Sequence, residues 1–216
     1  IAQGIITQIN EDSRHRLWVG SWNHGFWLID TQDHIVNYRD RPQLPSNFVR
    51  TFCEDNQGRI WMGTYLGLVC YTPSTQQWQT FTAQSQQGSL TDSSIWSIIR
   101  DAQGTLWLGT YFGGVNYFNP EYEIYTQYRV SDTPGGGLSS PIVGRMTEDN
   151  FGKLWICTEG GGLNVYDRRT KRFTWYGYPG SMISQKNLKC IHFDSLRNVL
   201  WVGTHLGGLD RIDLTT

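Results

Sequence analysis

A five-residue pattern recurs five times along this chain of 216 residues. It consists of an apolar residue, tryptophan, an apolar residue, glycine and then threonine or serine, with cysteine replacing the glycine in one copy. Successive tryptophans lie 43 to 48 residues apart, and a fixed period in this range indicates stacked copies of one supersecondary unit. The pattern therefore predicts a repeat protein, in which shared positions build the fold and variable positions can build a site. The copies begin at Leu17, Ile60, Leu106, Leu154 and Leu200.

The third copy shows what one repeat contains. Its short apolar runs are separated by Gly, Pro, Asn and Asp, which is typical of antiparallel strands joined by tight turns. No window of useful length has the i, i+3, i+4, i+7 spacing of an amphipathic helix. Four such strands form a meander of about 46 residues, which is the size of one β-propeller blade. The expected strands are residues 95–100, 105–110, 115–118 and 124–128.

The expected fold class is therefore all-β, a β-propeller of four-stranded antiparallel blades. Residues 1–216 are interpreted as a single propeller segment with five blade repeats, of which the last lacks its fourth strand. Each repeat tryptophan is expected to be buried between neighbouring blades. The repeats span approximately residues 4–40, 44–82, 90–129, 138–177 and 183–216.

An aspartate precedes every repeat tryptophan, by six residues in the first four copies and by seven in the last. Aspartate side chains form turns by accepting hydrogen bonds from the backbone two residues further on, so these residues are predicted to be structural. Three copies also place a glycine three residues after the aspartate, where a turn needs a positive φ. The aspartates are Asp12, Asp55, Asp101, Asp149 and Asp194, and the glycines are Gly58, Gly104 and Gly152.

Composition excludes several functions. The net charge is −1 and no basic run is present, so nucleic-acid binding is not expected. No apolar stretch of about 18 residues exists, so no membrane contact is expected from this segment. The four cysteines show no C-x-x-C spacing and do not recur with the repeat, which predicts buried free thiols. The histidines lack metal-ligand spacing, and no catalytic constellation, cofactor site or metal site is predicted.

The fourth copy is the most informative for family. It reads Glu-Asp-Asn-Phe-Gly-Lys-Leu-Trp over 148–155 and Gly-Gly-Leu-Asn-Val-Tyr-Asp over 161–167, which resembles the two-component regulator propeller repeat. The resemblance recurs in all five copies and covers essentially the whole chain. The sequence departs from the repeat at Cys157, which replaces the glycine, and at Ser21, which replaces the threonine.

This resemblance implies a function. Such repeats are typical of the periplasmic sensor region of Bacteroidetes hybrid two-component histidine kinases, where they usually form seven-bladed propellers ahead of a membrane helix. It therefore implies an extracytoplasmic ligand-sensing segment of an inner-membrane protein that signals through a phosphorelay, with an oligosaccharide as ligand. The implied partners are further blades of the same polypeptide or of another subunit, or a second copy in a homodimer.

Two sets of variable positions are candidate binding residues. In a propeller, the turns between second and third strands share a face with the loops that enter each blade. Aromatic faces stack on sugar rings and polar neighbours fix hydroxyls, although these residues could also be ordinary turn residues that cover blade edges. The residue after the threonine or serine reads Trp22, Tyr65, Tyr111, Glu159 and His205, and its neighbours include Asn23, His24 and Phe112.

The second set lies near the start of the first strands, which line the channel of a propeller. Basic residues there could bind an anionic sugar through charge-assisted hydrogen bonds, or they could be solvated lining with neutralising partners. This set comprises Arg50, Trp96, Arg145 and Lys189. Two other functions stay open: a protein-interaction propeller that uses the same loops, and a lyase in which His24 and His205 act as acid and base.

Overall fold

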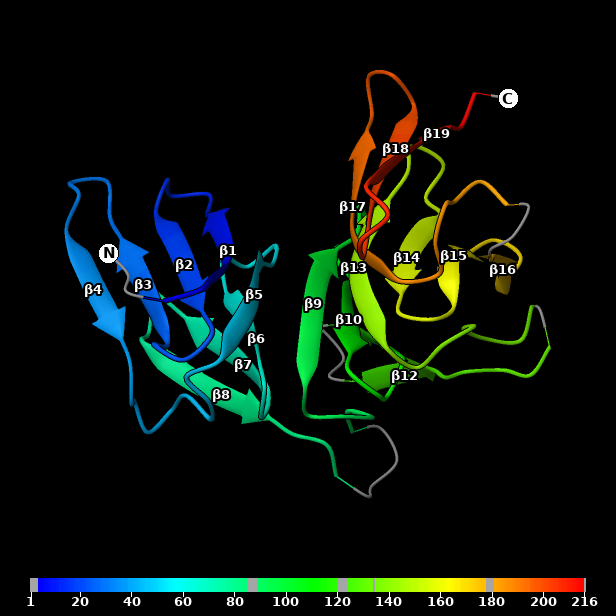
Figure 1. The fold of residues 1–216 in the computed structure, drawn as a ribbon. Helices are drawn as coiled ribbons and strands as arrows, with labels where there is room; N and C mark the ends of the chain where they lie inside the picture. Colours follow the sequence, from blue (N-terminus) through cyan, green and yellow to red (C-terminus); the bar gives the residue numbers. More distant parts are fainter. Residues whose placement is uncertain (1–3, 85–88, 120–123, 134, 178–180, 216) are drawn as a thin grey trace. The chain divides into compact units, whose positions relative to one another are not determined.

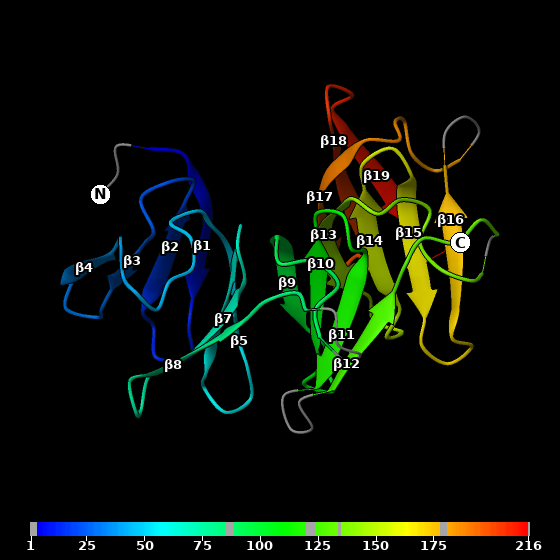
Figure 2. The same cartoon turned by 90° about the horizontal axis from the view of Figure 1, so that it is seen from below.

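The computed structural model describes residues 4–84, 89–119, 124–133, 135–177 and 181–215. Within these ranges the regular structure is entirely β, with five antiparallel sheets in which each strand pairs with the next one along the chain (Figures 1 and 2). Four sheets have four strands and the last has three. This confirms the predicted all-β class, the blade repeat and the missing fourth strand of the last blade.

The strands of the first two sheets are β1 (Ile6–Glu11), β2 (Leu17–Ser21), β3 (Phe26–Ile29), β4 (Ile35–Tyr38), β5 (Val49–Glu54), β6 (Ile60–Thr64), β7 (Leu68–Thr72) and β8 (Gln77–Phe81). The third and fourth sheets contain β9 (Ile95–Arg100), β10 (Leu106–Thr110), β11 (Val115–Asn119), β12 (Ile124–Tyr128), β13 (Val143–Glu148), β14 (Leu154–Thr158), β15 (Gly162–Asp167) and β16 (Arg172–Tyr176). The last sheet consists of β17 (Leu188–Asp194), β18 (Val199–Thr204) and β19 (Leu209–Asp213).

These sheets are distributed over two compact units. The first unit comprises Ile1–Leu108 and Phe118–Tyr125, and the second comprises Gly109–Tyr117 and Thr126–Thr216. The first two sheets lie wholly in the first unit, and the fourth and fifth lie wholly in the second. The third sheet contributes strands to both.

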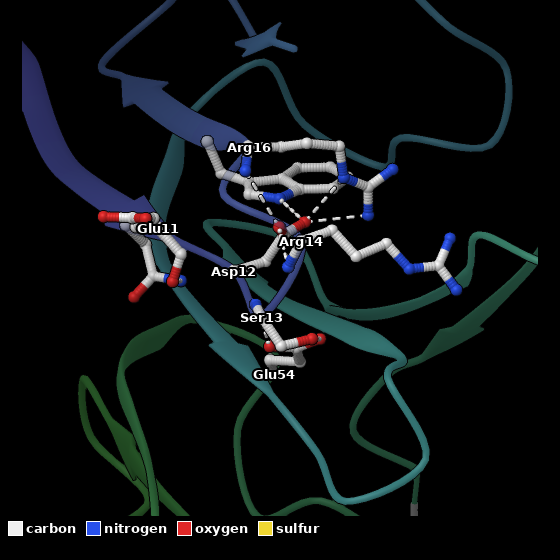
Figure 3. A network of polar contacts seen from close by, with 8 residues as sticks. Glu11, Asp12, Ser13, Arg14, Arg16 and Glu54 are labelled. Atoms are coloured by element: carbon white, nitrogen blue, oxygen red, sulfur yellow. Dashed lines mark hydrogen bonds and ion pairs between the residues drawn. The ribbon is translucent and has the colours of Figure 1, made fainter. Parts of the chain in front are cut away.

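The first four turn aspartates bind the repeat tryptophans. Asp12 Oδ1 accepts from the backbone N–H groups of Arg14 and Arg16, both at 3.0 Å, while Oδ2 accepts from Arg16 Nε and Trp18 Nε1, both at 2.8 Å (Figure 3). In the next turn residue, Ser13 N and Oγ donate to the Glu54 carboxylate, which joins the first sheet to the second. The predicted structural role of the aspartates is confirmed and extends to the buried indole.

The hydrogen bond from the indole to the aspartate recurs with nearly constant length in the first four copies. The distances from the indole Nε1 to the aspartate Oδ2 are 2.8 Å for Trp18 and Asp12, 2.8 Å for Trp61 and Asp55, 2.7 Å for Trp107 and Asp101, and 2.8 Å for Trp155 and Asp149. A buried N–H without an acceptor is costly, so this bond permits a tryptophan at the centre of each blade. The predicted positive φ is also present at Gly58, Gly104 and Gly152.

Three of the repeat tryptophans pack against the sheet that follows them. Trp18 contacts Phe52 with ring centroids 6.1 Å apart, and Trp61 contacts Phe118 at 5.1 Å. Trp155 belongs to a buried cluster with Leu188 and Val202 of the last sheet. Glycine in the second strand allows this close approach, since a Cβ at Gly63 would lie 2.7 Å from Ile95 Cγ2.

Two expectations were wrong, and both concern the last sheet. Trp201 is only half-buried, whereas the other four repeat tryptophans are at most 4 % exposed. Cys190 is exposed, although Cys53, Cys70 and Cys157 are buried free thiols as predicted. Both residues occupy positions that face the following sheet in earlier blades, and the described part of the chain places no sheet after β19. In that described part, no helix has the length and apolar character needed to cross a membrane.

Candidate ligand-binding surface

A β-bulge is present at the predicted first-strand positions. The register between first and second strands shifts between Val49 and Thr51 in the second sheet and between Leu188 and Cys190 in the last. The bulge residues, which have no cross-strand partner in this register, are Arg50 and Lys189. In the fourth sheet the shift falls between Val143 and Met146, which leaves Gly144 and Arg145 outside the regular register. Bulges re-aim side chains, and here they act on the variable positions of the repeat.

The predicted turn residues are tied to the segment immediately ahead of the bulged strand. In four sheets, the residue after the threonine or serine donates its backbone N–H to the carbonyl of the residue that precedes the first strand. These pairs are Trp22 with Ile5 (3.0 Å), Tyr65 with Phe48 (3.0 Å), Glu159 with Ile142 (3.0 Å) and His205 with Asn187 (2.8 Å). Within each of these sheets, the turn and the entering loop therefore lie together, as the sequence predicts.

In the first unit this arrangement encloses Arg50 in aromatic rings. The guanidinium carbon lies 4.3 Å from the ring centre of Phe48, 4.5 Å from that of Trp96 and 5.2 Å from that of Tyr65. Its Nη1 donates to Ser94 Oγ at 2.7 Å and to the Ile95 carbonyl at 3.3 Å. Arg50 is only 6 % exposed. A guanidinium over ring faces is held by cation–π attraction, which strengthens as water is removed.

A fourth ring, that of Trp22, completes the group. The ring centres of Trp22 and Phe48 are 4.0 Å apart, and those of Phe48 and Tyr65 are 6.0 Å apart with nearly parallel planes. Because Trp22 and the Arg50 guanidinium each lie about 4 Å from the centre of Phe48, they cannot share one of its faces, so Phe48 is sandwiched. Trp22 and Tyr65 are each 49 % exposed. We refer to Trp22, Phe48, Arg50, Tyr65 and Trp96 as the aromatic–arginine cluster.

An ordered loop presents Phe48. Asp40 N donates to Asn47 Oδ1 at 2.9 Å, and Asn47 Nδ2 donates back to Asp40 Oδ1 at 2.5 Å. The Asn47 carbonyl accepts from Gly25 N at 2.9 Å, which ties the loop to the turn of the first sheet. Leu44 anchors the loop in the core with 7 % exposure. These contacts fix the ring that lies between Trp22 and Arg50.

Sequence reasoning did not single out Phe48. It precedes the strand, outside the two sets of variable positions, but the structure places it at the centre of the cluster. The equivalent positions in three other copies are Ile5, Ile142 and Asn187. Comparing that position across copies would have identified the one aromatic residue among these four.

Two further candidates belong to the first unit. Asn23 is exposed in the turn that carries Trp22. His24 is half-buried; its backbone N–H donates to Ser21 Oγ at 2.9 Å, and its ring lies 6.4 Å from that of Trp27. Of the predicted set, the structure thus brings together Trp22, Tyr65, Arg50 and Trp96.

The remaining candidates belong to the second unit, where the local chemistry differs. Lys189 Nζ forms an ion pair with Glu159 Oε1, with side chains 40 % and 28 % exposed. Tyr111 and Phe112 make an edge-to-face pair with centroids 4.4 Å apart, and His205 is exposed. Burial lowers the pKa of Arg145 below its ordinary value. Of the basic bulge residues, Arg50 therefore contacts aromatic rings in the first unit and Lys189 pairs with a carboxylate in the second.

Comparisons with known proteins agree with the repeat pattern. A model of the two-component regulator propeller family matches residues 43–66 and 89–112, which run from the end of one entering loop to the following turn. Both matched segments are similar to two-component regulator propeller repeats. The matched segments of the regulator propeller include Phe48, Arg50, Tyr65 and Trp96, so most of the cluster lies within the repeats that the model recognises.

Solved structures show the same fold. Two are extracellular domains from B. thetaiotaomicron, described as parts of hybrid two-component systems. The first is 24 % identical, with a TM-score of 0.78 over 96 % of this chain and 26 % of that one; the second is 23 % identical, with 0.81 over 97 % and 30 %. Virginiamycin B lyase from Staphylococcus aureus is 14 % identical, with a TM-score of 0.68 over 99 % of this chain and 71 % of the lyase.

At these identities the likeness establishes the β-propeller fold alone. The chain spans between a quarter and a third of the length of the two extracellular domains. No curated protein matches the sequence significantly. The likeness to the two-component regulator propeller family therefore rests on the two matched segments.

Proposed function

We propose that this chain is a ligand-sensing segment from the extracytoplasmic, periplasmic part of a hybrid two-component histidine kinase, and that its ligand is an oligosaccharide bound at the aromatic–arginine cluster. The observation that carries the proposal is the pair of half-exposed rings, Trp22 and Tyr65, which both pack against the ring of the half-buried Phe48. The regulator propeller repeats and the two extracellular domains of the same fold supply the context.

The chemistry of the cluster suits a sugar. Sugar rings have apolar CH faces that pack on aromatic faces, and their hydroxyls need polar groups at the rim. Asn23 lies beside Trp22 and offers an exposed amide for this purpose. A rigid platform also limits the entropy lost on binding, and the hydrogen-bonded loop that presents Phe48 supplies such rigidity.

The location of the cluster suits signalling. Its side chains come from the turn of the first sheet, from the second sheet and from β9 of the third sheet. A ligand that contacts Trp22 and Tyr65 together therefore favours one packing of the first sheet on the second. A ligand shifts an equilibrium only through differential affinity for its states, and contacts that span sheets provide that difference.

The proposal includes partners. Ile9 is 62 % exposed and Leu209 is 63 % exposed, whereas the equivalent residues of the second sheet, Phe52 and Leu68, are buried against a neighbouring sheet. Further blades, of the same polypeptide or of another subunit, or a second copy in a homodimer, would cover these positions. Light scattering at increasing protein concentration measures the second-copy case directly, and a constant monomer mass would contradict it.

Binding is tested by a thermal-shift screen of the 216-residue chain against oligosaccharides, followed by calorimetry on any compound that raises the Tm. We expect Trp22→Ala and Tyr65→Ala each to weaken binding about tenfold, which is usual for exposed aromatic anchors. Phe151→Ala is the matched control, since Phe151 is a 73 % exposed aromatic residue in a turn of the second unit. Equal loss of affinity in all three variants, or none in the first two, would contradict this site.

A further inference from the structure

We infer that the sugar recognised at the aromatic–arginine cluster is uncharged, and that Arg50 is a positioning residue for the rings and does not contact an anionic group of the ligand. The inference rests on the proposed function and goes beyond it, because it names the ligand class and assigns Arg50 a role. It decides against the alternative that the basic first-strand positions select an acidic sugar.

The first step is the environment of the guanidinium. Recognition of a carboxylate or sulfate by arginine requires N–H groups that point at the anion, commonly two at once. In this chain the guanidinium lies 4.3 Å from the Phe48 ring and 4.5 Å from the Trp96 ring, and its Nη1 donates to Ser94 and Ile95. With 6 % of Arg50 exposed, a ligand would have to displace these rings to reach the charge.

The second step is what these contacts do. The bulge at Arg50 turns its side chain from β5 toward the segment that enters β9, where Ser94 Oγ accepts at 2.7 Å. The same guanidinium contacts one face of Phe48, whose other face carries Trp22. Arg50 therefore holds Phe48 between the first and third sheets and thereby sets the position of the exposed indole.

The third step is the surface left for the ligand. Trp22 and Tyr65 are each 49 % exposed, and the electron-rich faces of such rings attract the slightly positive CH groups of a sugar ring. A carboxylate or sulfate placed against the same faces meets the negative side of the ring quadrupole. In the second unit, the bulge residue Lys189 forms an ion pair with Glu159, so its charge is also balanced within the protein.

The experiment is calorimetry on the 216-residue chain with matched oligosaccharides at low and high salt. The neutral probes are gluco-, manno-, xylo- and galacto-oligosaccharides, and the acidic probes are oligogalacturonate and sulfated galactan fragments of equal length. We expect the tightest ligand to be neutral, with an affinity that changes less than about twofold between 20 mM and 500 mM NaCl. Salt screens contacts between exposed charges, and a neutral ligand makes none.

Two variants separate positioning from direct contact. Arg50→Met should weaken neutral binding by the same factor at both salt concentrations, and Arg50→Lys should restore part of it by returning a cation to the rings. Circular dichroism shows whether each variant is folded. If Arg50→Met is not, the salt dependence and ligand preference of the unaltered chain still distinguish a neutral ligand from an acidic one. A tighter acidic ligand whose affinity falls steeply with salt would overturn the inference and leave the proposed function standing. Failure of every sugar to bind would overturn both.

Discussion

The turns that precede Trp61 and Trp201 both begin with an aspartate and both contain an asparagine and an arginine, but their aspartates make different contacts. At Trp61, the Asp55 carboxylate lies in the turn and accepts from the indole at 2.8 Å. At Trp201, the aspartate is one residue further away, and both oxygens of Asp194 accept from Arg197, from its backbone N–H at 3.1 Å and its Nη1 at 2.8 Å. The first tryptophan is 1 % exposed and the second is half-buried.

The difference shows how much of the blade depends on spacing and on a neighbour. With six residues between aspartate and tryptophan, one carboxylate closes the turn and satisfies a buried donor. With seven, Asp194 is the last residue of β17 and pairs with Val199, and its carboxylate binds Arg197, whose side chain is 74 % exposed. Both copies thus place an aspartate ahead of a tryptophan, but only the copy at Trp61 adds a buried hydrogen bond to the stability of its blade.

The largest expected effect comes from the tryptophans themselves. Trp61→Ala should lower the free energy of unfolding by about 3–5 kcal/mol, because it empties a site packed by Phe81 and Phe118. Trp201→Ala should cost less than half as much, since part of that ring already faces solvent. Urea unfolding of both variants measures the two values, and equal losses would show that the described contacts do not account for the stability of the enclosed blades.

The aspartates should follow the same order with a smaller effect. Asp55→Ala removes the acceptor for Trp61 Nε1 and for the backbone N–H groups of Gln57 and Arg59, so it should cost about 1–3 kcal/mol. Asp194→Ala removes contacts to a largely exposed arginine and should lower the unfolding midpoint far less than Asp55→Ala does. A loss at Asp194 as large as that at Asp55 would contradict the distinction between the two turns.

Much of this distinction is readable from the sequence. The period of the tryptophans gave the blades, and the alternation of short apolar runs with turn residues gave their strands, because both patterns are set by local backbone geometry. The aspartates were assigned to turns on the same ground. Their bond to the indole was not predicted, since a six-residue separation does not by itself reveal that two side chains meet across a turn.

The candidate site was only partly predictable for a related reason. Trp22, Arg50, Tyr65 and Trp96 were identified as variable positions, but they were assigned to two different sets. They converge because a bulge at Arg50 and a hydrogen-bonded loop at Phe48 bring the sets together, and neither feature has a strong sequence signature. The exposure of Cys190 was missed because burial was inferred from the strand alone, while it depends on the neighbouring sheet.

Shortening the turn before Trp201 by one residue should give the last copy the hydrogen bond between aspartate and indole that the other copies have. Leu196 is 94 % exposed, and deleting it restores the six-residue spacing and moves Asn198, whose φ is 54°, to the third position after the aspartate. In the first two turns His15 and Gly58 have positive φ at that position. We expect Asp194 to accept from Trp201 Nε1 in this variant and stability to rise by about 1 kcal/mol. An indole N–H that exchanges with solvent as fast as before would contradict this.

The smallest expected effect is a difference in acid sensitivity. Burial alone would raise the pKa of Asp12, but hydrogen bonds from Trp18 and Arg16 outweigh it and hold that pKa below its ordinary value of 3.8. The hydrogen bond and charge of Arg197 likewise lower the pKa of Asp194, at the surface. In both cases the unfolded chain binds a proton more readily, so the stability from each carboxylate is complete above about pH 4 and is lost as the pH falls through the folded value.

Salt separates the two carboxylates. Contacts at the surface are screened by 0.5 M NaCl, whereas the enclosed bonds of Asp12 are not. Asp12→Asn should therefore flatten the loss of stability below pH 4 at both low and high salt, and Asp194→Asn should do so at low salt only. Unfolding midpoints from pH 2 to 5 test this. If salt abolished the effect of Asp12→Asn as well, the Asp12 carboxylate would be acting as a surface charge. Its buried hydrogen bonds would then not explain why the repeat keeps an aspartate six residues before its tryptophan.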